Sequence, residues 1–193
     1  MLKRNESNEP ENERRADAWA NRCGVCYRRG ALDAAVADCD RALKLDAQYA
    51  VAWNNRGLAR QEKGELGSAL SDFDRAIALA PQQAAFYTNR GGAWLRKGEP
   101  ECALNDLNRA LALDPKLAEA WGHRGEAWFA KQEFTRAIAD FDQALKLNPR
   151  MADACGSRGV GRLMQGKVEE AEADFGRCRA LGGALKPEVE RLV

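Results

Sequence analysis

Apolar and small residues recur through most of the chain at spacings of three and four, in stretches of about fourteen residues. This spacing places them on one face of a helix, so each stretch is predicted to be an amphipathic helix. Short turns separate the helices of a pair, and glycines such as Gly64 and Gly98 suit the left-handed conformation that ends a helix. Gln132 replaces the glycine in one turn, which is expected to be slightly strained. The pattern predicts an all-α protein built from helical hairpins.

The hairpins repeat without insertion or deletion over five segments: 16–49, 50–83, 84–117, 118–151 and 152–183. In the second segment, positions 4, 8, 20, 24 and 32 are Trp53, Gly57, Ala69, Phe73 and Pro81. This lattice, with its period of 34 residues, resembles the tetratricopeptide repeat (TPR) over about residues 16–183. The first and fifth segments depart from it most, as terminal repeats do. The resemblance implies an α-α superhelix, a solenoid of five helix-turn-helix repeats.

Glycine stands at the eighth position inside a predicted helix in four segments, where it costs about 1 kcal/mol relative to alanine. Alanine stands at the twentieth position in all five. We therefore expect two helices to cross closely between these positions.

Both ends of the chain differ from the repeats. Residues 1–15 are polar, lack the apolar core of a signal peptide, and are interpreted as a disordered lead-in. Residues 184–193 have Pro187 at a plausible first helical position and are predicted to form a short C-terminal capping helix.

Charge is nearly balanced, with 30 basic and 29 acidic residues and one histidine. We therefore expect no nucleic-acid partner. No apolar run reaches the roughly 18–20 residues needed to span a bilayer, so no membrane span is expected. The chain is predicted to be cytoplasmic, or periplasmic if a targeting segment is missing from it.

Five of the six cysteines (Cys23, Cys26, Cys39, Cys155 and Cys178) stand at positions that face the interior of the lattice. Packing as small apolar residues is favoured over a redox or zinc role. The Cys23/Cys26 pair lies in the middle of a helix, no second pair follows it, and the only histidine is three repeats away. We expect no metal site and no cofactor, and many buried thiols favour a reducing compartment.

Arginine fills position 7 and aspartate position 23 in every repeat. One interpretation pairs each aspartate with a basic residue three positions later on its own helix. The other joins each arginine to an aspartate of its own or the preceding repeat, as a partly buried ladder. Gln143 stands at the pairing position in the fourth repeat although Asp140 is kept, which favours the ladder. The columns are Arg22, Arg56, Arg90, Arg124 and Arg158, and Asp38, Asp72, Asp106, Asp140 and Asp174.

The family resemblance places ligands on a concave groove lined by the first helix of each repeat. Position 6 reads Asn21, Asn55, Asn89, His123 and Ser157. An asparagine amide can bind both polar groups of a peptide unit, and the column resembles the asparagine ladder of some superhelical TPR domains. The alternative is a set of solvated groove residues. A carboxylate clamp is disfavoured because position 2 lacks lysine.

Aromatic and acidic side chains add to this predicted groove. Tyr27 and Phe129, at position 12, are candidates for its wall, whereas the aromatic residues at position 4 are predicted to lie in the core. Acidic residues on the same face favour a basic ligand, although Arg28 and Arg96 oppose that preference. The acidic residues are Asp17, Glu119, Glu126 and Asp153.

The sequence lacks a glycine-rich phosphate loop, a nucleophile elbow and a paired-histidine metal motif, so no enzyme activity is expected. We predict a scaffold or adaptor for protein–protein interaction that binds an extended peptide or a helix of a partner in the concave groove. One alternative is a structural protein that self-associates through residues 181–193 as a homo-oligomer. The other is an accessory subunit of an enzyme or of a secretion or envelope complex.

Overall fold

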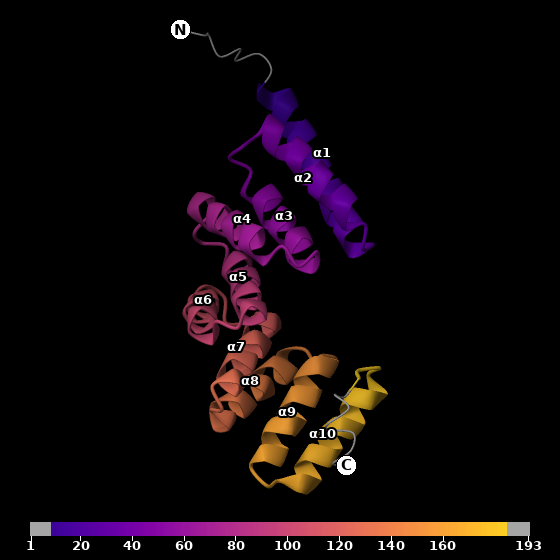
Figure 1. Cartoon of the computed structure of the whole chain (residues 1–193), viewed down its shortest axis with the longest axis vertical. Coiled ribbons are helices and arrows are strands. Elements are labelled where there is room, and N and C mark those ends of the chain that lie inside the picture. The colour runs from indigo at the N-terminus through magenta and orange to yellow at the C-terminus, as the bar shows by residue number, and fades with distance from the viewer. Residues whose placement is uncertain (1–8, 185–193) are drawn as a thin grey trace. The chain divides into compact units, whose positions relative to one another are not determined.

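The computed structural model describes residues 9–184, which form ten helices and no strand (Figure 1). Consecutive helices pair as hairpins, with one pair in each predicted repeat, which confirms the all-α architecture of tandem helical hairpins. None of the ten is long and apolar enough to cross a membrane. They are α1 (Glu9–Arg28), α2 (Leu32–Leu45), α3 (Ala50–Glu62), α4 (Leu66–Leu79), α5 (Ala84–Lys97), α6 (Pro100–Leu113), α7 (Ala118–Ala130), α8 (Phe134–Leu147), α9 (Ala152–Met164) and α10 (Val168–Ala180).

The first helix is longer than the sequence predicted. Residues 9–15, expected in a disordered lead-in, form the start of α1. That expectation is wrong here because glutamate and arginine, which make up five of these seven residues, propagate a helix well. Residues 1–8 and the predicted capping helix, apart from Ala184, lie outside the described residues.

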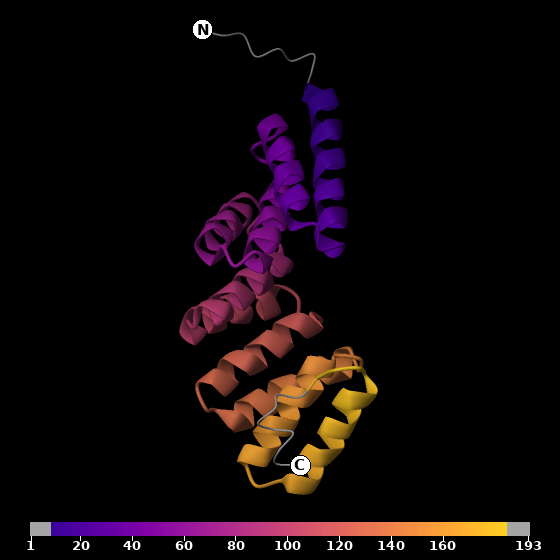
Figure 2. The same cartoon turned by 45° about the vertical axis from the view of Figure 1, so that its right-hand side comes forward.

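The chain divides into two compact units, residues 1–93 and 94–193, with the boundary inside α5. In the first unit α1 packs against α2, and α3 packs against α1, α2 and α4. In the second unit α7 packs against α6 and α8, and α9 packs against α8 and α10 (Figure 2). The turn at Gln132 adopts a φ of 61°, the one positive φ of a non-glycine residue between residues 9 and 184, which confirms its predicted strain.

A glycine and a phenylalanine meet at the centre of several hairpins. A Cβ atom added to Gly125 would lie 2.7 Å from the ring of Phe141, a residue only 1% exposed. Glycine at position 8 is therefore required by the ring at position 24. The alanines at position 20, which we expected to explain it, are buried but are not the nearest neighbours. The pairs are Gly57 with Phe73, Gly125 with Phe141 and Gly159 with Phe175.

The first repeat has cysteines at both of these positions, and they form a disulfide between Cys23 of α1 and Cys39 of α2. Both residues are fully buried, as predicted, but the expectation of free thiols is wrong for this pair. Interior positions suit a free thiol and a half-cystine equally, so the sequence pattern could not distinguish them. Cys26 remains free, with its Sγ 3.8 Å from Asp38 Oδ2.

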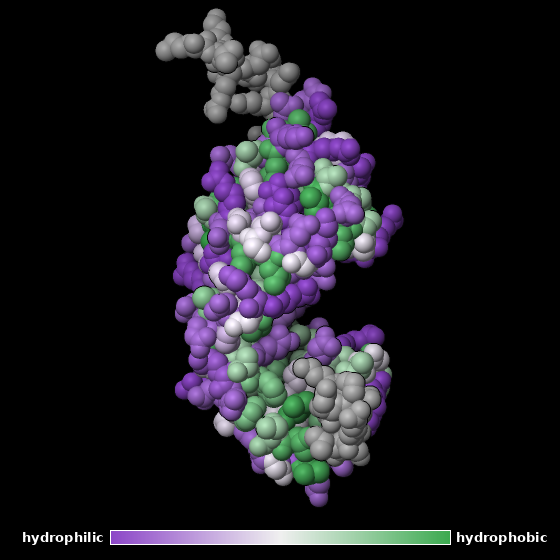
Figure 3. Space-filling view, viewed as in Figure 1, coloured by the Kyte–Doolittle hydropathy of each residue, from purple (hydrophilic) through white to green (hydrophobic). Residues whose placement is uncertain are grey.

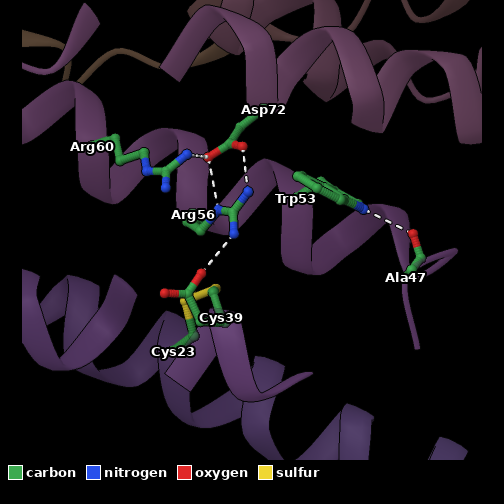
Figure 4. A network of polar contacts seen from close by, with 8 residues as sticks. Cys23, Cys39, Ala47, Trp53, Arg56, Arg60 and Asp72 are labelled. Carbon is green, nitrogen blue, oxygen red and sulfur yellow. Dashed lines mark hydrogen bonds and ion pairs between the residues drawn. A yellow bond between two sulfur atoms is a disulfide. The ribbon is translucent and has the colours of Figure 1, made fainter. Parts of the chain in front are cut away.

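The arginines of position 7 form a ladder that joins neighbouring hairpins. Arg56 donates from Nε and Nη2 to both carboxylate oxygens of Asp72, at 2.9 and 2.7 Å, and from Nη1 to Asp40 of the preceding repeat at 2.6 Å (Figure 4). Asp72 is nearly buried and also accepts from Arg60. A paired fork of this kind holds both partners in one geometry.

The same arrangement recurs along the chain, which supports the ladder interpretation. The preceding-repeat partner stands at position 25, a column that the sequence analysis did not single out. The pairs include Arg22 with Asp38, Arg56 with Asp72 and Asp40, Arg90 with Asp74, Arg124 with Asp140 and Asn108, and Arg158 with Asp174 and Asp142.

Aromatic residues at position 4 support these arginines. The guanidinium carbon of Arg56 lies 4.5 Å from the ring centre of Trp53, and that of Arg124 lies 4.6 Å from Trp121. Trp53 also donates from its indole nitrogen to the carbonyl oxygen of Ala47 in the preceding loop, at 3.0 Å. In the first four repeats the aromatic ring thereby holds the ladder arginine in place.

Candidate functional site

Asparagine amides connect the first helices of the first unit. Asn89 Nδ2 on α5 donates to Asn54 Oδ1 on α3 at 2.8 Å. Asn54 Nδ2 lies 3.5 Å from Asn55 Oδ1, and Asn55 Nδ2 lies 3.5 Å from the carbonyl oxygen of Ala20 on α1. Contacts of 3.5 Å are at the long limit of a hydrogen bond. The structure therefore brings Asn55 and Asn89 together through Asn54, and part of their bonding capacity is used within the protein.

The other two candidates of the first unit lie on α1. Asn21 is exposed to solvent. Tyr27 is partly buried and packs against the apolar cluster that contains Cys23 and Cys39. Tyr27 therefore contributes to the core of the first hairpin, and its role as a groove wall stays a prediction.

His123, at position 6 of the fourth repeat, is held by an acidic neighbour on α7. Its Nδ1 lies 3.1 Å from Glu126 Oε2, and its side chain is 38% exposed. Burial acts to lower the pKa of His123, but the hydrogen bond to Glu126 and the charges of Glu126 and Glu119 outweigh it. The charge of Arg96 also acts to lower it. The net effect raises the pKa of His123 above its ordinary value.

A pocket of about 410 Å³ opens in the second unit, between the first helices of the fourth and fifth repeats. Its apolar lining includes Phe129 and Val160, and Glu126, Asp153 and Ser157 supply polar groups. In the space-filling view hydrophobic surface gathers over α8 and α9 (Figure 3). The remaining lining residues are Ala130, Phe141, Gly156, Cys178 and Ala184.

Of the groove residues predicted from the sequence, Phe129 lines this pocket. His123 does not line it, but contacts Glu126, which does. The sequence analysis named Glu126, Asp153 and Ser157 on this face and missed Val160. Val160 stands at position 9 of the fifth repeat, and Glu126 stands at the same position of the fourth. Comparison of these equivalent positions could have predicted that Val160 lies on this face. Phe129 is itself supported by Phe134, whose ring centre lies 5.3 Å away.

No metal centre is suggested by the described residues, among which no three histidine, cysteine, aspartate or glutamate side chains are grouped to hold an ion. The pocket offers one hydroxyl, two carboxylates and an apolar floor, a lining suited to binding a side chain.

Comparisons with known structures support the fold. MamA from Desulfovibrio magneticus RS-1 is 20% identical, with a TM-score of 0.72 over 87% of this chain and 95% of that one. PilF of Pseudomonas aeruginosa is 19% identical, with a TM-score of 0.82 over 90% of this chain and 79% of that one. YrrB, described as a TPR protein, is 23% identical, with a TM-score of 0.65 over 89% of each chain. A search of curated proteins finds no match.

Three family models match the sequence directly. A TPR repeat model matches residues 25–64, and two tetratricopeptide repeat models match residues 54–116 and 118–151. Together with the ten helices in tandem hairpins, these matches agree with about five repeats. The chain belongs to the tetratricopeptide repeat proteins.

Proposed function

We propose that this chain binds a segment of a protein partner, extended or helical, on the face formed by the first helices of its repeats. A scaffold role in protein–protein interaction is indicated by the family and by neighbours such as MamA and YrrB. The finer proposal adds where the partner binds and what part of the partner is bound.

The pocket lined by Phe129, Val160 and Ser157 is the observation that carries this proposal. It lies on the face that the family uses, and partly exposed aromatic residues are typical anchors of a binding surface. Its volume of about 410 Å³ falls within the range of about 300–1,000 Å³ that is typical of ligand pockets.

The amide chain of the first unit supplies a second kind of contact. Asn21 is exposed, and the carboxamide oxygen of Asn89 can still accept a hydrogen bond from a ligand backbone. The structure of YrrB is described as having an unusual peptide-binding site, which makes a peptide the natural first ligand class to test.

The compartment is a separate proposal. A buried disulfide such as Cys23–Cys39 is typical of proteins from oxidising compartments and rare in the cytosol. It favours the periplasmic alternative over the cytoplasmic prediction. Alkylation of free thiols in freshly lysed native cells, followed by mass spectrometry, tests this: modified Cys23 and Cys39 would point back to the cytoplasm.

Selection from a random peptide library tests the binding proposal. Phage-displayed peptides are selected against the purified chain, synthesised with a fluorescent label and measured by anisotropy. Val160→Glu should weaken the selected peptides at least tenfold, about 1.4 kcal/mol of binding free energy, because it places a charge on the apolar floor. Val168→Glu, the same change at an exposed residue of α10 outside this pocket, is the matched control.

The outcomes separate the candidate functions. Peptides that bind both glutamate variants as tightly as the unaltered chain would place the site elsewhere. A failure to enrich any peptide, combined with a mass in solution that rises with protein concentration, would favour self-association instead. Circular dichroism of each variant confirms that its helices are retained.

A further inference from the structure

The pocket of the second unit carries an unbalanced charge. Of its ten lining residues two are acidic, Glu126 and Asp153, and none is basic. The remainder are apolar or small, with the hydroxyl of Ser157 as the one other polar side chain apart from the Cys178 thiol. Carboxylates at the rim of a concave, partly apolar site concentrate the field and attract cations.

We propose that this pocket is specific for a lysine or arginine side chain of the bound segment, an inference that rests on the binding function proposed above. The side chain would lay its apolar stem on Phe129 and Val160 and direct its cationic end to Glu126 and Asp153.

The three arginines of α7 and α9 do not cancel this charge, because their guanidinium groups donate to other carboxylates. Arg96 of α5 and Arg179 of α10 exert an opposing charge at His123 and Cys178. Arg158 of α9 donates to Asp174 and Asp142, and Arg162 donates to Asp174. Arg124 of α7 is likewise occupied by its partners in the ladder. These arginines pair with carboxylates outside the pocket. Within residues 9–184, neither Glu126 nor Asp153 forms an ion pair with an arginine or lysine.

The shape and chemistry of the pocket match a long basic side chain better than the alternatives. Lysine and arginine have three or four methylene groups below a charged tip, and the pocket lining likewise combines apolar side chains with two carboxylates. An arginine plane over Phe129 would add a cation–π contact. An acidic side chain would be repelled, and a purely apolar one would bring no positive charge to the two carboxylates.

The protonation state of His123 changes the net charge beside Glu126, and therefore the charge that a ligand meets in the pocket. His123 shares a hydrogen bond with Glu126, so the neutral imidazole leaves the carboxylate negative and available, whereas the protonated ring offsets it. Experiments on charge preference are therefore best made at a pH above the pKa of His123.

Substitution within the selected peptides tests the inference. Each lysine or arginine of the tightest peptide is replaced in turn by norleucine, which keeps an apolar stem and removes the charge. One replacement should weaken binding at least tenfold to the unaltered chain. It should have little effect on the double variant Glu126→Gln/Asp153→Asn, because the partner charges are gone.

A second double variant, Glu133→Gln/Glu172→Gln, makes the same change in net charge at exposed positions outside the pocket and serves as the control. It should keep the full difference between the basic peptide and its norleucine twin. An equal loss in both double variants would mean that only the overall charge matters, and would overturn the pocket-specific inference.

The inference and the binding proposal fail differently. Selected peptides that contain no basic residue, yet lose affinity with Val160→Glu, would overturn the inference and keep the binding site. Peptides insensitive to Val160→Glu would overturn both. A chain ending at Ala184 that binds the peptide far more tightly would identify residues 185–193 as the occupant of the pocket, and that result too would overturn the inference.

Discussion

The first and fourth repeats hold their two helices together by different means at the same two positions. In the fourth, Gly125 leaves room for the buried ring of Phe141. In the first, Cys23 and Cys39 are covalently joined. A buried ring stabilises the folded state by removing apolar surface from water, whereas a disulfide acts largely by restricting the unfolded chain. The packing of one hairpin therefore depends on shape, and that of the other on redox conditions.

The ladder arginine also differs between these two repeats, in its partners and in its exposure to solvent. Arg124 bonds both Asp140 and Asn108 of the preceding repeat, and its side chain is 19% exposed. Arg22 bonds Asp38 and is 55% exposed, with no preceding hairpin among residues 9–184. The arginine of this column thus links two hairpins in the fourth repeat, whereas in the first it is a half-exposed side chain that binds the buried Asp38 of its own hairpin.

Removal of the Phe141 ring should cause the largest loss of stability among the changes that distinguish the two repeats. Phe141→Ala empties the space facing Gly125 and should lower the free energy of unfolding by about 3–5 kcal/mol. Urea unfolding followed by tryptophan fluorescence measures the loss, and amide hydrogen exchange locates it. Exchange should rise in α7 and α8 and stay unchanged in α1 and α2. A loss below about 1 kcal/mol would mean that the ring is not the centre of the hairpin.

Reduction of the disulfide should be the next largest change, confined to the first repeat. Opening the bond between Cys23 and Cys39, separated by 16 positions, should lower the free energy of unfolding by about 3 kcal/mol. Dithiothreitol titrated into the protein under hydrogen exchange should release amides of α1 and α2 first. The variant Cys23→Ala/Cys39→Ala should not respond to the reductant. A response in that variant would assign the effect to another thiol.

The ladder arginines should differ between the repeats by a smaller amount. Arg124→Ala leaves the nearly buried Asp140 without its fork and should cost about 2–3 kcal/mol of unfolding free energy. Arg22→Ala removes a half-exposed partner from the buried Asp38, which Arg41 still contacts, and should cost less than Arg124→Ala. Urea unfolding measures both losses. If both variants lost only a few tenths of a kcal/mol of unfolding free energy, the ladder would contribute no more than exposed ion pairs do.

Much of the fold followed from periodicity, because a strict 34-residue period forces equivalent positions into equivalent environments. The arginine and aspartate columns were visible for the same reason. The column of position 25 that completes the ladder belongs to the same lattice but was missed. The disulfide was not predictable, since a periodic pattern gives the face of a helix but not the separation of two sulfur atoms. The extent of α1 was missed because a polar helix without a regular apolar stripe resembles a disordered segment.

The site was less predictable than the fold. Phe129, Glu126 and Asp153 could be placed on one face from their repeat positions, and the structure adds that they share a pocket with Val160. Whether several residues enclose a volume depends on side-chain sizes contributed by different helices, which a column of a repeat does not specify. The amides of Asn55 and Asn89 stood at the predicted position, but their contacts through Asn54 needed coordinates.

The smallest expected difference between the two repeats is one of pH, since position 6 is Asn21 in the first and His123 in the fourth. A histidine whose folded pKa is raised stabilises the folded state fully below its unfolded pKa, about 6.5, and this contribution is lost as the pH rises through the folded pKa. The fourth repeat should therefore gain a small stability on acidification through neutral pH that the first repeat lacks. Because the chain has one histidine, its ring resonances can be followed by NMR without ambiguity.

Glu126→Gln should move the His123 titration midpoint downward, because the carboxylate that favours the protonated ring is removed while burial still opposes protonation. Glu133→Gln, an exposed change of the same kind on the turn before α8, should leave the midpoint in place. A midpoint below the ordinary histidine value in the unaltered protein would show that burial and Arg96 outweigh the two glutamates. In that case acidification would favour the unfolded state, and the pH difference between the two repeats would have the opposite sign.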